Sequence, residues 1–389
     1  MKEKSLDWTQ KMESIWGKGN PIHIIESPAR INIIGEHVDY LGGLVLPAAI
    51  HFSTFLAIRA NSEGKIRLHS IHFNESLELS SPEVQTEKKW ANYILGVVEE
   101  LKKSGQKIDG FDLIVDGNIP QGAGLSSSAS LEVGVGYGLS RIFNLSLSRP
   151  ELAILGQKAE NNFVGTQCGI MDQFIIAVGQ KDKAILLNTE TLEINYHSIH
   201  LENAEFYLIN SHVKHSLETS SYNDRRKEAE SAFQKILKLQ PGIKNLYSTP
   251  EDGFDPDLYS FTENEKKRVM HVLGEKERTQ KILKAFREGE EIAAGKALGE
   301  SHVSLSELYE VSCPETDFLV KELSSEGVLG ARMIGGGFGG CILVLDKIGN
   351  YEKVKSNVLE KYFQKFSIRA EFFPFQISDG VREIVNSEV

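Results

Sequence analysis

The segment from Phe111 to Leu139 constrains the fold most strongly, because a strand, a glycine turn and a helix follow one another without interruption. Phe111–Val115 is apolar and rich in β-branched residues, and Asn118-Ile-Pro-Gln-Gly122 ends it. Glycines let a backbone approach a ligand closely, and a helix N-terminus carries partial positive charge. Serine hydroxyls add donors and a potential metal ligand. With a helix beginning within Ser126–Ser130, we predict a phosphate-binding loop formed by Gly122, Ala123, Gly124, Leu125, Ser126, Ser127 and Ser128.

This loop differs from the common phosphate-binding motifs. The sequence has no G-x-x-x-x-G-K-[ST] motif, and Ser127 stands where the dinucleotide-binding fingerprint requires its third glycine. The H-R-D and D-F-G motifs of protein kinases are also missing from the sequence. A simpler interpretation stays open, in which a serine only caps the helix after an ordinary glycine turn.

A second group of polar side chains lies near the N-terminus. Arg30 falls on a predicted strand, and Glu36, His37 and Asp39 follow on a turn anchored by Gly35. Each carboxylate can accept two hydroxyl hydrogen bonds, and bonds to a charged acceptor are the stronger kind. The cluster suits a ligand rich in hydroxyl groups, although a solvated turn with incidental charges remains the alternative.

Two further carboxylates, Glu160 and Asp172, flank a segment that contains glycines. A helix that ends at this segment and a chain that turns back could bring both carboxylates towards the phosphate-binding loop. Phosphoryl transfer needs a metal ion held by oxygen ligands, and a group that positions or deprotonates the acceptor. The pair meets this need, but acidic residues at such a spacing are more often surface groups.

Residues 335–340 contain five glycines and precede a predicted strand at Cys341–Leu345. Such a run allows backbone conformations that other residues avoid. It is consistent either with a loop that approaches a ligand or with a tight turn that serves packing alone.

The two halves of the chain differ in character. Strands and helices are mixed up to about residue 195, whereas the remainder is strongly helical, with many Glu–Lys pairs four residues apart. We predict an α+β protein of two closely packed domains, residues 1–195 and 196–389, with a cleft between them. Helical spacing is expected at residues 5–17, 89–103, 150–163, 219–238, 262–288, 289–309 and 314–326.

The composition excludes several classes of protein. The formal net charge of −11 argues against a nucleic-acid partner. Three scattered cysteines cannot form a disulfide framework or a Cys-x-x-Cys metal site, which favours the reducing cytoplasm. The longest apolar stretch, Gly43–Ile58, is interrupted by Pro47 and is too short to cross a bilayer. We therefore expect a soluble protein with no membrane partner.

The loop Pro120-x-Gly-x-Gly-Leu-Ser-Ser-Ser-Ala129 resembles the ATP-binding loop of the GHMP small-molecule kinases. The segment Arg30-Ile-Asn-Ile-Ile-Gly-Glu-His-Val-Asp-Tyr40 is similar to the signature that separates galactokinases from other members of this family. Val38 replaces the Thr that is usual there. The resemblance extends from about residue 21 to 345 in the family's order. It implies a two-domain GHMP kinase fold, with a mixed α/β N-terminal domain and a helix-rich α+β C-terminal domain.

The resemblance also implies roles for individual residues at the sugar. Asp172 would be the base that faces the C1 hydroxyl, with Arg30 beside it as a cation that keeps it ionised. Gly169 belongs to the matching segment Cys168–Gln173, and Tyr222 to the matching stretch His215–Arg226. The residues implied to bind galactose are Glu36, His37, Asp39, Gly169 and Tyr222.

At the nucleotide, the resemblance assigns Glu160 and Ser128 to Mg²⁺. Lys89-Trp-Ala-Asn-Tyr93 resembles the segment whose tryptophan, here Trp90, lies by the adenine of ATP. The glycine run at 335–340 resembles a loop close to the phosphates and the substrate, with Ile334 where Thr is usual.

These matches imply that ATP phosphorylates the C1 hydroxyl of D-galactose, giving galactose 1-phosphate and ADP for galactose catabolism. We expect a cytoplasmic monomer that uses Mg²⁺. Two alternatives remain: a kinase for a related sugar (N-acetylgalactosamine, arabinose or galacturonate), or a sensor that binds galactose and ATP without turnover. The intact Ser126–Ser130 segment, with Asp172 and Arg30, favours an enzyme.

Overall fold

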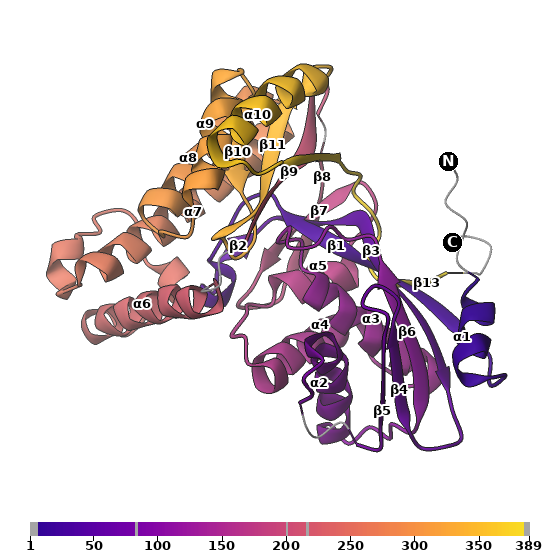
Figure 1. Cartoon of the computed structure of the whole chain (residues 1–389). Helices are drawn as coiled ribbons and strands as arrows, with labels where there is room; N and C mark the ends of the chain where they lie inside the picture. Colours follow the sequence, from indigo (N-terminus) through magenta and orange to yellow (C-terminus); the bar gives the residue numbers. More distant parts are fainter. Residues whose placement is uncertain (1–6, 82–84, 200, 215–217, 385–389) are drawn as a thin grey trace.

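The structure is a computed structural model of the chain, and it describes residues 7–81, 85–199, 201–214 and 218–384. Figure 1 shows a first half of mixed helices and strands, coloured from indigo to magenta. The second half, from rose through orange to yellow, consists of helices and a four-stranded sheet. The predicted α+β class is confirmed.

The first half is built on a six-stranded sheet that is antiparallel except where β4 pairs with β6. The end of the chain returns to this sheet, so that the last strand pairs with the first. In spatial order the strands are β13 (Arg382–Ile384), β1 (His23–Asn32), β3 (Pro47–Ala60), β6 (Phe111–Gly117), β4 (Ile66–Ser70) and β5 (Glu75–Leu79).

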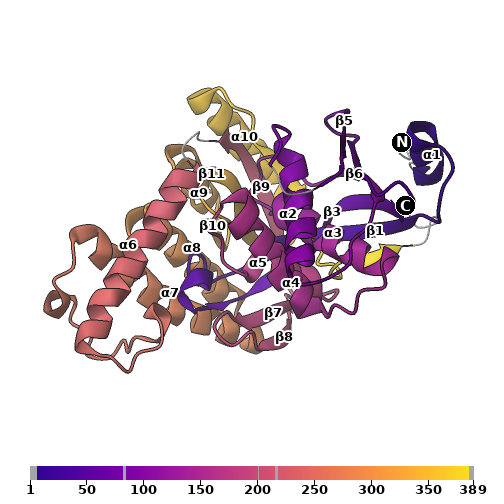
Figure 2. The same cartoon turned by 90° about the horizontal axis from the view of Figure 1, so that it is seen from below.

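Helices cover both faces of this sheet (Figures 1 and 2). Successive residues of a strand point to opposite faces, so Ile24 of β1 packs with Trp8 of α1 while Ile25 packs with Ile58 against α3. This is why β1 and β3 are apolar at neighbouring positions. The helices are α1 (Trp8–Trp16) on one face, and α2 (Lys89–Lys103), α3 (Ser127–Ile142), α4 (Arg149–Lys158) and α5 (Met171–Val178) on the other.

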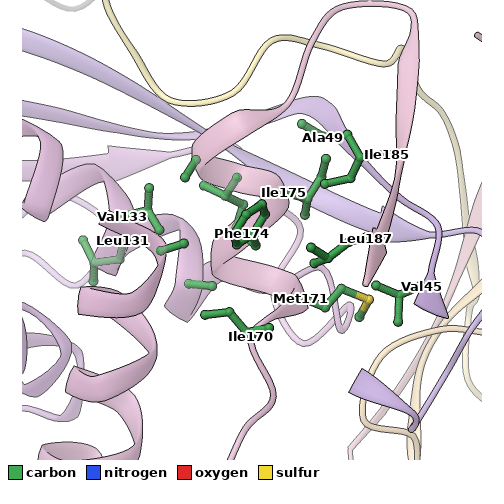
Figure 3. Packing of buried hydrophobic residues seen from close by; sticks show 14 of the residues in the cluster. Val45, Ala49, Leu131, Val133, Ile170, Met171, Phe174, Ile175, Ile185 and Leu187 are labelled. Atoms are coloured by element: carbon green, nitrogen blue, oxygen red, sulfur yellow. The ribbon is translucent and has the colours of Figure 1, made fainter. Parts of the chain in front are cut away.

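The position of α5 is fixed by its apolar side chains (Figure 3). Phe174 and Ile175 point into the core near Val133 of α3, and Met171 lies by Val45. Burial of these side chains anchors the helix by the hydrophobic effect. Asp172, in the first turn, keeps 27% of its side-chain surface exposed. Because α5 is fixed in this way, the Asp172 carboxylate is held outside the hydrophobic core.

A three-stranded sheet packs on β3, and the second half contains a four-stranded sheet on which α8 and α9 pack. The small sheet consists of β2 (Leu44–Val45), β7 (Lys183–Asn188) and β8 (Ile194–Ser198). The other sheet has the order β10 (Gly330–Met333), β11 (Gly339–Lys347), β9 (Ala204–Lys214) and β12 (Glu371–Pro374). The helices of the second half are α6 (Glu218–Leu239), α7 (Glu263–Glu288), α8 (Glu291–Glu307), α9 (Pro314–Ser325) and α10 (Tyr351–Phe366). Short 3₁₀ turns occupy Asp39–Leu41, Leu246–Ser248 and Pro256–Tyr259.

Each of the expected helices has a counterpart in the structure. The expected helix at 150–163 is α4 followed by a wider, π-type turn at Ala159–Val164. The expected helix at 5–17 is α1, although residues 5 and 6 lie outside the described residues, as do 215–217 at the start of the stretch that contains Tyr222. The domain boundary at 195/196 falls within β8 and stays a prediction. Among the residues that the structure describes, no helix is both long and apolar enough to cross a membrane.

Candidate active site

A cavity of about 500 Å³ is lined by residues from both halves of the chain. The predicted phosphate-binding loop, the turn at Glu36–Asp39, the start of α5 and the glycine run at 335–340 meet there. Of the predicted site residues, the cavity is lined by Arg30, Glu36, His37, Asp39, Gly122, Ala123, Gly124, Leu125, Ser126, Ser127, Ser128, Glu160, Gly169, Asp172 and Tyr222.

Arg30 and Asp172 form a two-point ion pair in this cavity. Nε of Arg30 lies 2.6 Å from Oδ1 of Asp172, and Nη2 lies 2.7 Å from Oδ2. Nη1 of Arg30 donates to the carbonyl of Gly124 at 2.7 Å, which ties the pair to the phosphate-binding loop. Arg30 is buried, whereas Asp172 stays partly exposed to the cavity. A planar guanidinium held on a strand therefore fixes the orientation of the carboxylate.

The phosphate-binding loop has an unusual backbone. Gly122, Gly124 and Ser126 all have positive φ, at 65°, 69° and 61°. Left-handed residues at alternating positions allow successive N–H groups to face one side, which is the backbone that the predicted anion-binding loop at the start of α3 requires. A serine is rarely found in this conformation, so the surroundings must hold Ser126 in place.

The Ser126 hydroxyl donates to Oδ2 of Asp172. The simpler interpretation, that this serine caps α3, is therefore wrong: at the N-cap position its side chain bonds to the carboxylate instead. Ser130, one turn into α3, bonds to the Ser27 carbonyl and the Thr54 hydroxyl and so serves packing. Ser127 and Ser128 line the cavity.

The glycine run at 335–340 lies against the phosphate-binding loop. A Cβ atom at Gly335 would lie 2.8 Å from the carbonyl of Gly124, and one at Gly340 would lie 3.3 Å from that of Ala123. Both glycines have positive φ, at 80° and 75°. The run is therefore more than a packing turn, because it forms part of the cavity wall. Ile334 also lines the cavity and brings no hydroxyl to it.

Glu36 is held by donors from both halves of the chain. Nδ2 of Asn32 donates to its Oε2 at 2.9 Å, and the backbone N–H of Gly335 donates to its Oε1 at 2.8 Å. Nη2 of Arg332 lies 3.3 Å from the same Oε1. Only 2% of Glu36 is exposed, so the carboxylate is desolvated and its direction is set by these bonds. The neighbouring Val38 is buried in the core, away from the cavity lining.

His37 and Asp39 have strongly shifted acidities. Burial lowers the pKa of His37 to about 3, so the imidazole is neutral, and its Nδ1 lies 2.8 Å from the Tyr40 hydroxyl. Burial, followed by the like charges of Asp172 and Glu36, raises the pKa of Asp39 to about 7. Perturbed groups that converge on one cavity are typical of functional sites.

Tyr222 of α6 and Gly169 complete this side of the cavity. The Tyr222 ring lies 5.4 Å from that of His37 and 5.7 Å from that of Tyr40, between centroids. Gly169 lies directly against the Asp39 carboxylate. A surface of neutral imidazole, tyrosine and carboxylate groups can donate to and accept from hydroxyl groups.

Glu160 and Ser128 both line the cavity, and the Ser128 hydroxyl bonds to the Glu160 carboxylate. Burial, and then Asp172, raises the pKa of Glu160 to about 7, while the Ser128 hydroxyl acts in the opposite direction. Nε2 of Gln173 donates to Oε2 of Glu160 at 2.9 Å and to Oε2 of Glu132 at 3.0 Å. A hydroxyl and a carboxylate are hard oxygen donors of the kind that Mg²⁺ prefers. Among the described residues, no three acidic, histidine or cysteine side chains form a complete metal cage.

Trp90 is the predicted site residue that the cavity does not include. Its indole N–H donates to Oε2 of Glu75 at 2.9 Å, at the edge strand β5. Tyr93, one turn further along α2, lines the cavity. The role of Trp90 beside adenine stays a prediction.

Several residues of this region were not identified from the sequence. Glu132 and Gln173 lie on helices whose pattern gave no reason to separate them from core positions, and both are fully buried. Charged or polar residues inside an apolar helical stripe are the available signal, since such side chains are rarely fully buried. The same signal occurs in α7, whose buried residues include Arg268, His271, Glu275 and Thr279.

Three family models match the chain. The GHMP kinases N terminal domain matches residues 92–180, and the GHMP kinases C terminal domain matches residues 282–365. The galactokinase galactose-binding signature matches residues 12–60, which include the turn at Glu36–Asp39.

Galactokinases resemble the chain over nearly its whole length. That of Thermotoga petrophila is 43% identical over 361 residues, covering 92% of this chain and 99% of the relative. That of Thermosipho africanus is 44% identical with the same coverage. The crystal structure of Lactococcus lactis galactokinase complexed with galactose superposes with a TM-score of 0.92 at 37% identity, covering 97% of this chain and 98% of that one. The chain therefore belongs to the galactokinase family of the GHMP kinases.

Proposed function

We propose that the protein transfers the γ-phosphoryl group of ATP to the C1 hydroxyl of D-galactose, giving galactose 1-phosphate and ADP. Family membership supports ATP-dependent phosphorylation of galactose. The observation that carries the proposal is the Arg30–Asp172 pair, which lies between the phosphate-binding loop and the turn at Glu36–Asp39. A hydroxyl bound beside Asp172 would lie next to the phosphates.

In this proposal Asp172 receives the proton of the C1 hydroxyl as the sugar oxygen attacks phosphorus. The O–H bond breaks, a new O–P bond forms, and the bond between phosphorus and the ADP oxygen breaks. Each carboxylate oxygen has two lone pairs, so Asp172 can accept this proton while it remains bonded to Arg30. Arg30 stabilises negative charge that builds up on the transferring group.

The sugar would be held by Glu36, His37, Asp39, Gly169 and Tyr222, and the nucleotide phosphates by the loop from Gly122 to Ser128. Carboxylates accept sugar hydroxyls strongly because such bonds are charge-assisted. The backbone N–H groups at the start of α3 have no partner within the helix and can donate to phosphate oxygens.

We further propose that Ser128 and Glu160 hold Mg²⁺ together with the phosphates. The two residues suit Mg²⁺ because they offer it a hydroxyl oxygen and a carboxylate beside the phosphate-binding loop. Mg²⁺ binds through few protein ligands when phosphates supply the others, which is compatible with a pair of residues. When bound, the ion neutralises phosphate charge. The Gln173 amide orients the Glu160 carboxylate from behind.

Other members of the kinase family act on other substrates, so the sugar needs a direct test. The experiment is an ATP-consumption assay over free galactose, N-acetylgalactosamine, arabinose, galacturonate and glucose. Galactose should give the highest kcat/KM. A higher value for another sugar would reassign the substrate, and absence of turnover with all of them would favour a sensor. The cytoplasmic location and the monomeric state stay predictions. Light scattering tests the monomeric state.

A further inference from the structure

Glu275, in the middle of α7, lies directly beneath the turn that carries Glu36. Its side chain is fully buried. Oε1 of Glu275 accepts the backbone N–H of Gly35 at 3.0 Å and that of Glu36 at 3.2 Å. A carboxylate from the second half of the chain thus binds two consecutive N–H groups of a turn in the first half.

The other side of the same turn is held by a neighbour of Glu275. His271 lies one helical turn earlier in α7, and its Nε2 is 3.1 Å from the carbonyl oxygen of Glu36. Nδ1 of His271 lies 2.8 Å from the Ser304 hydroxyl of α8, which fixes the ring. Both the donor and the acceptor of the Glu36 backbone are therefore occupied by α7, and the residue cannot rotate without losing them.

The Glu275 carboxylate is itself compensated. Nε of Arg278 donates to Oε2 at 2.7 Å, and the Ser301 hydroxyl lies 2.9 Å from Oε1 and 3.0 Å from Oε2. Burial alone would raise the pKa of Glu275, but the charge of Arg278 and its other neighbours lower it to about 2. The group is therefore an anion at neutral pH. Burying a charge costs free energy unless hydrogen bonds and an opposite charge compensate it. The compensated burial of Glu275 therefore points to a specific role for this carboxylate.

The turn needs such support because its backbone is sharply bent. Gly35 has a φ of 93°, and a Cβ atom there would lie 2.5 Å from the carbonyl of Leu44. His37, two residues later, is also left-handed, with a φ of 57°. Residues in such conformations persist only where the surroundings determine them.

We propose that Glu275 is a positioning residue for the sugar: by fixing the Gly35–Glu36 peptide it directs the Glu36 carboxylate into the cavity. This inference rests on the proposed function, because it takes Glu36 as a sugar ligand. The phosphate-binding loop is held instead by Arg30 and by the glycine run, without a contact to Glu275 in the described part of the chain. Loss of Glu275 should therefore weaken galactose binding more than ATP binding.

The test compares Glu275→Gln with a matched control, Glu265→Gln. Glu265 lies in the same helix and is 5% exposed, and it bonds to Ser231 and Lys235 rather than to the turn. A glutamine at 275 has one acceptor atom and one NH₂ group, so it cannot serve both Arg278 and the backbone N–H groups. We expect the KM for galactose to rise by about tenfold or more, the ratio that corresponds to 1.4 kcal/mol. The KM for ATP should stay within about twofold for Glu275→Gln, as should both values for Glu265→Gln.

Ser301→Ala is a milder second variant, in case Glu275→Gln does not fold. It removes one donor from Glu275, and we expect a rise of about fivefold in the KM for galactose alone, the usual net effect of losing one hydrogen bond. Equal changes in both KM values, or a galactose KM in Glu275→Gln that matches that of Glu265→Gln, would overturn the inference. So would a non-folding Glu275→Gln together with an unchanged Ser301→Ala. A wild-type protein without galactose-dependent ATP turnover would instead reject the proposed function.

Discussion

Gly169 and Asp39 touch so closely that a Cβ atom at residue 169 would lie 1.8 Å from Oδ2 of Asp39. The absence of a side chain at Gly169 is therefore what leaves room for the Asp39 carboxylate at the proposed sugar site. Its backbone φ is not in the left-handed region, so the requirement for glycine at this position is one of space.

Gly169→Ala should raise the KM for galactose by about tenfold or more, because a displaced Asp39 loses charge-assisted bonds worth about 1.5–3 kcal/mol. The KM for ATP should change little. Gly299→Ala is the matched control, since a Cβ atom there meets nothing within 4 Å. Steady-state kinetics with each substrate varied checks this. An unchanged galactose KM in Gly169→Ala would contradict the assignment of Asp39.

Asp172→Asn should lower kcat by about 10²-fold or more, the usual cost of losing a general base, with little change in galactose affinity. The amide keeps the shape of the carboxylate but cannot take up the proton. Asp116→Asn, at the end of β6, changes a carboxylate outside the cavity and should behave as wild type. Turnover near the wild-type rate in Asp172→Asn would mean that this residue only orients the hydroxyl.

The stability of the sugar-free protein should depend on the ionisation of Asp39. Its pKa is raised from an ordinary 3.8 to about 7, so its favourable contribution is complete below pH 3.8 and is lost as the pH rises through about 7. Between pH 5 and pH 8 the wild type should therefore lose more stability than Asp39→Asn, in which this titration is removed. Thermal unfolding followed by circular dichroism at several pH values measures the difference. Parallel stability profiles of the two proteins would show that the pKa of Asp39 is not raised in the folded state.

Glu160→Gln should increase the Mg²⁺ concentration needed for half-maximal activity by about tenfold or more, because even outer-shell partners of a metal contribute this much. Galactose affinity measured without nucleotide should be unaffected. Glu151→Gln provides a control, since Glu151 is an exposed residue of the capping box of α4. The same Mg²⁺ dependence in all three proteins would exclude Glu160 as a ligand.

Local pattern was enough to predict many of the elements. α2 occupies residues 89–103 as expected, because its apolar spacing is regular and Gly105 follows it. α7 and α9 begin at Glu263 and Pro314, behind Thr262 and Cys313 at their N-caps. By contrast α5, with only eight residues and an almost wholly buried surface, has no amphipathic period to recognise. β4, β5 and α10 were also missed.

The residues of the candidate site likewise fall into those that the sequence could predict and those that it could not. The loop at Gly122–Ser128 could be predicted because its chemistry is contiguous in sequence, and the Glu36–Asp39 cluster could be identified by resemblance. The contacts of Glu275 with Gly35 could not, since the two residues meet only when the halves of the chain pack together. The bond from Ser126 to Asp172 could not be predicted either, because it joins the starts of α3 and α5, two helices of the first half that meet only when that half folds. Sequence pattern finds groups on one segment, whereas tertiary packing decides which groups from distant segments meet.

The most direct test of phosphoryl transfer to the C1 hydroxyl is to identify, by phosphorus and proton NMR, the product formed from galactose and ATP. With Asp172 facing the C1 hydroxyl beside the phosphate-binding loop, the new phosphate resonance should couple to the anomeric proton of galactose, and ADP should appear in equal amount. A phosphate coupled to protons at C6 or at any other carbon, or ADP formed without a sugar phosphate, would contradict it.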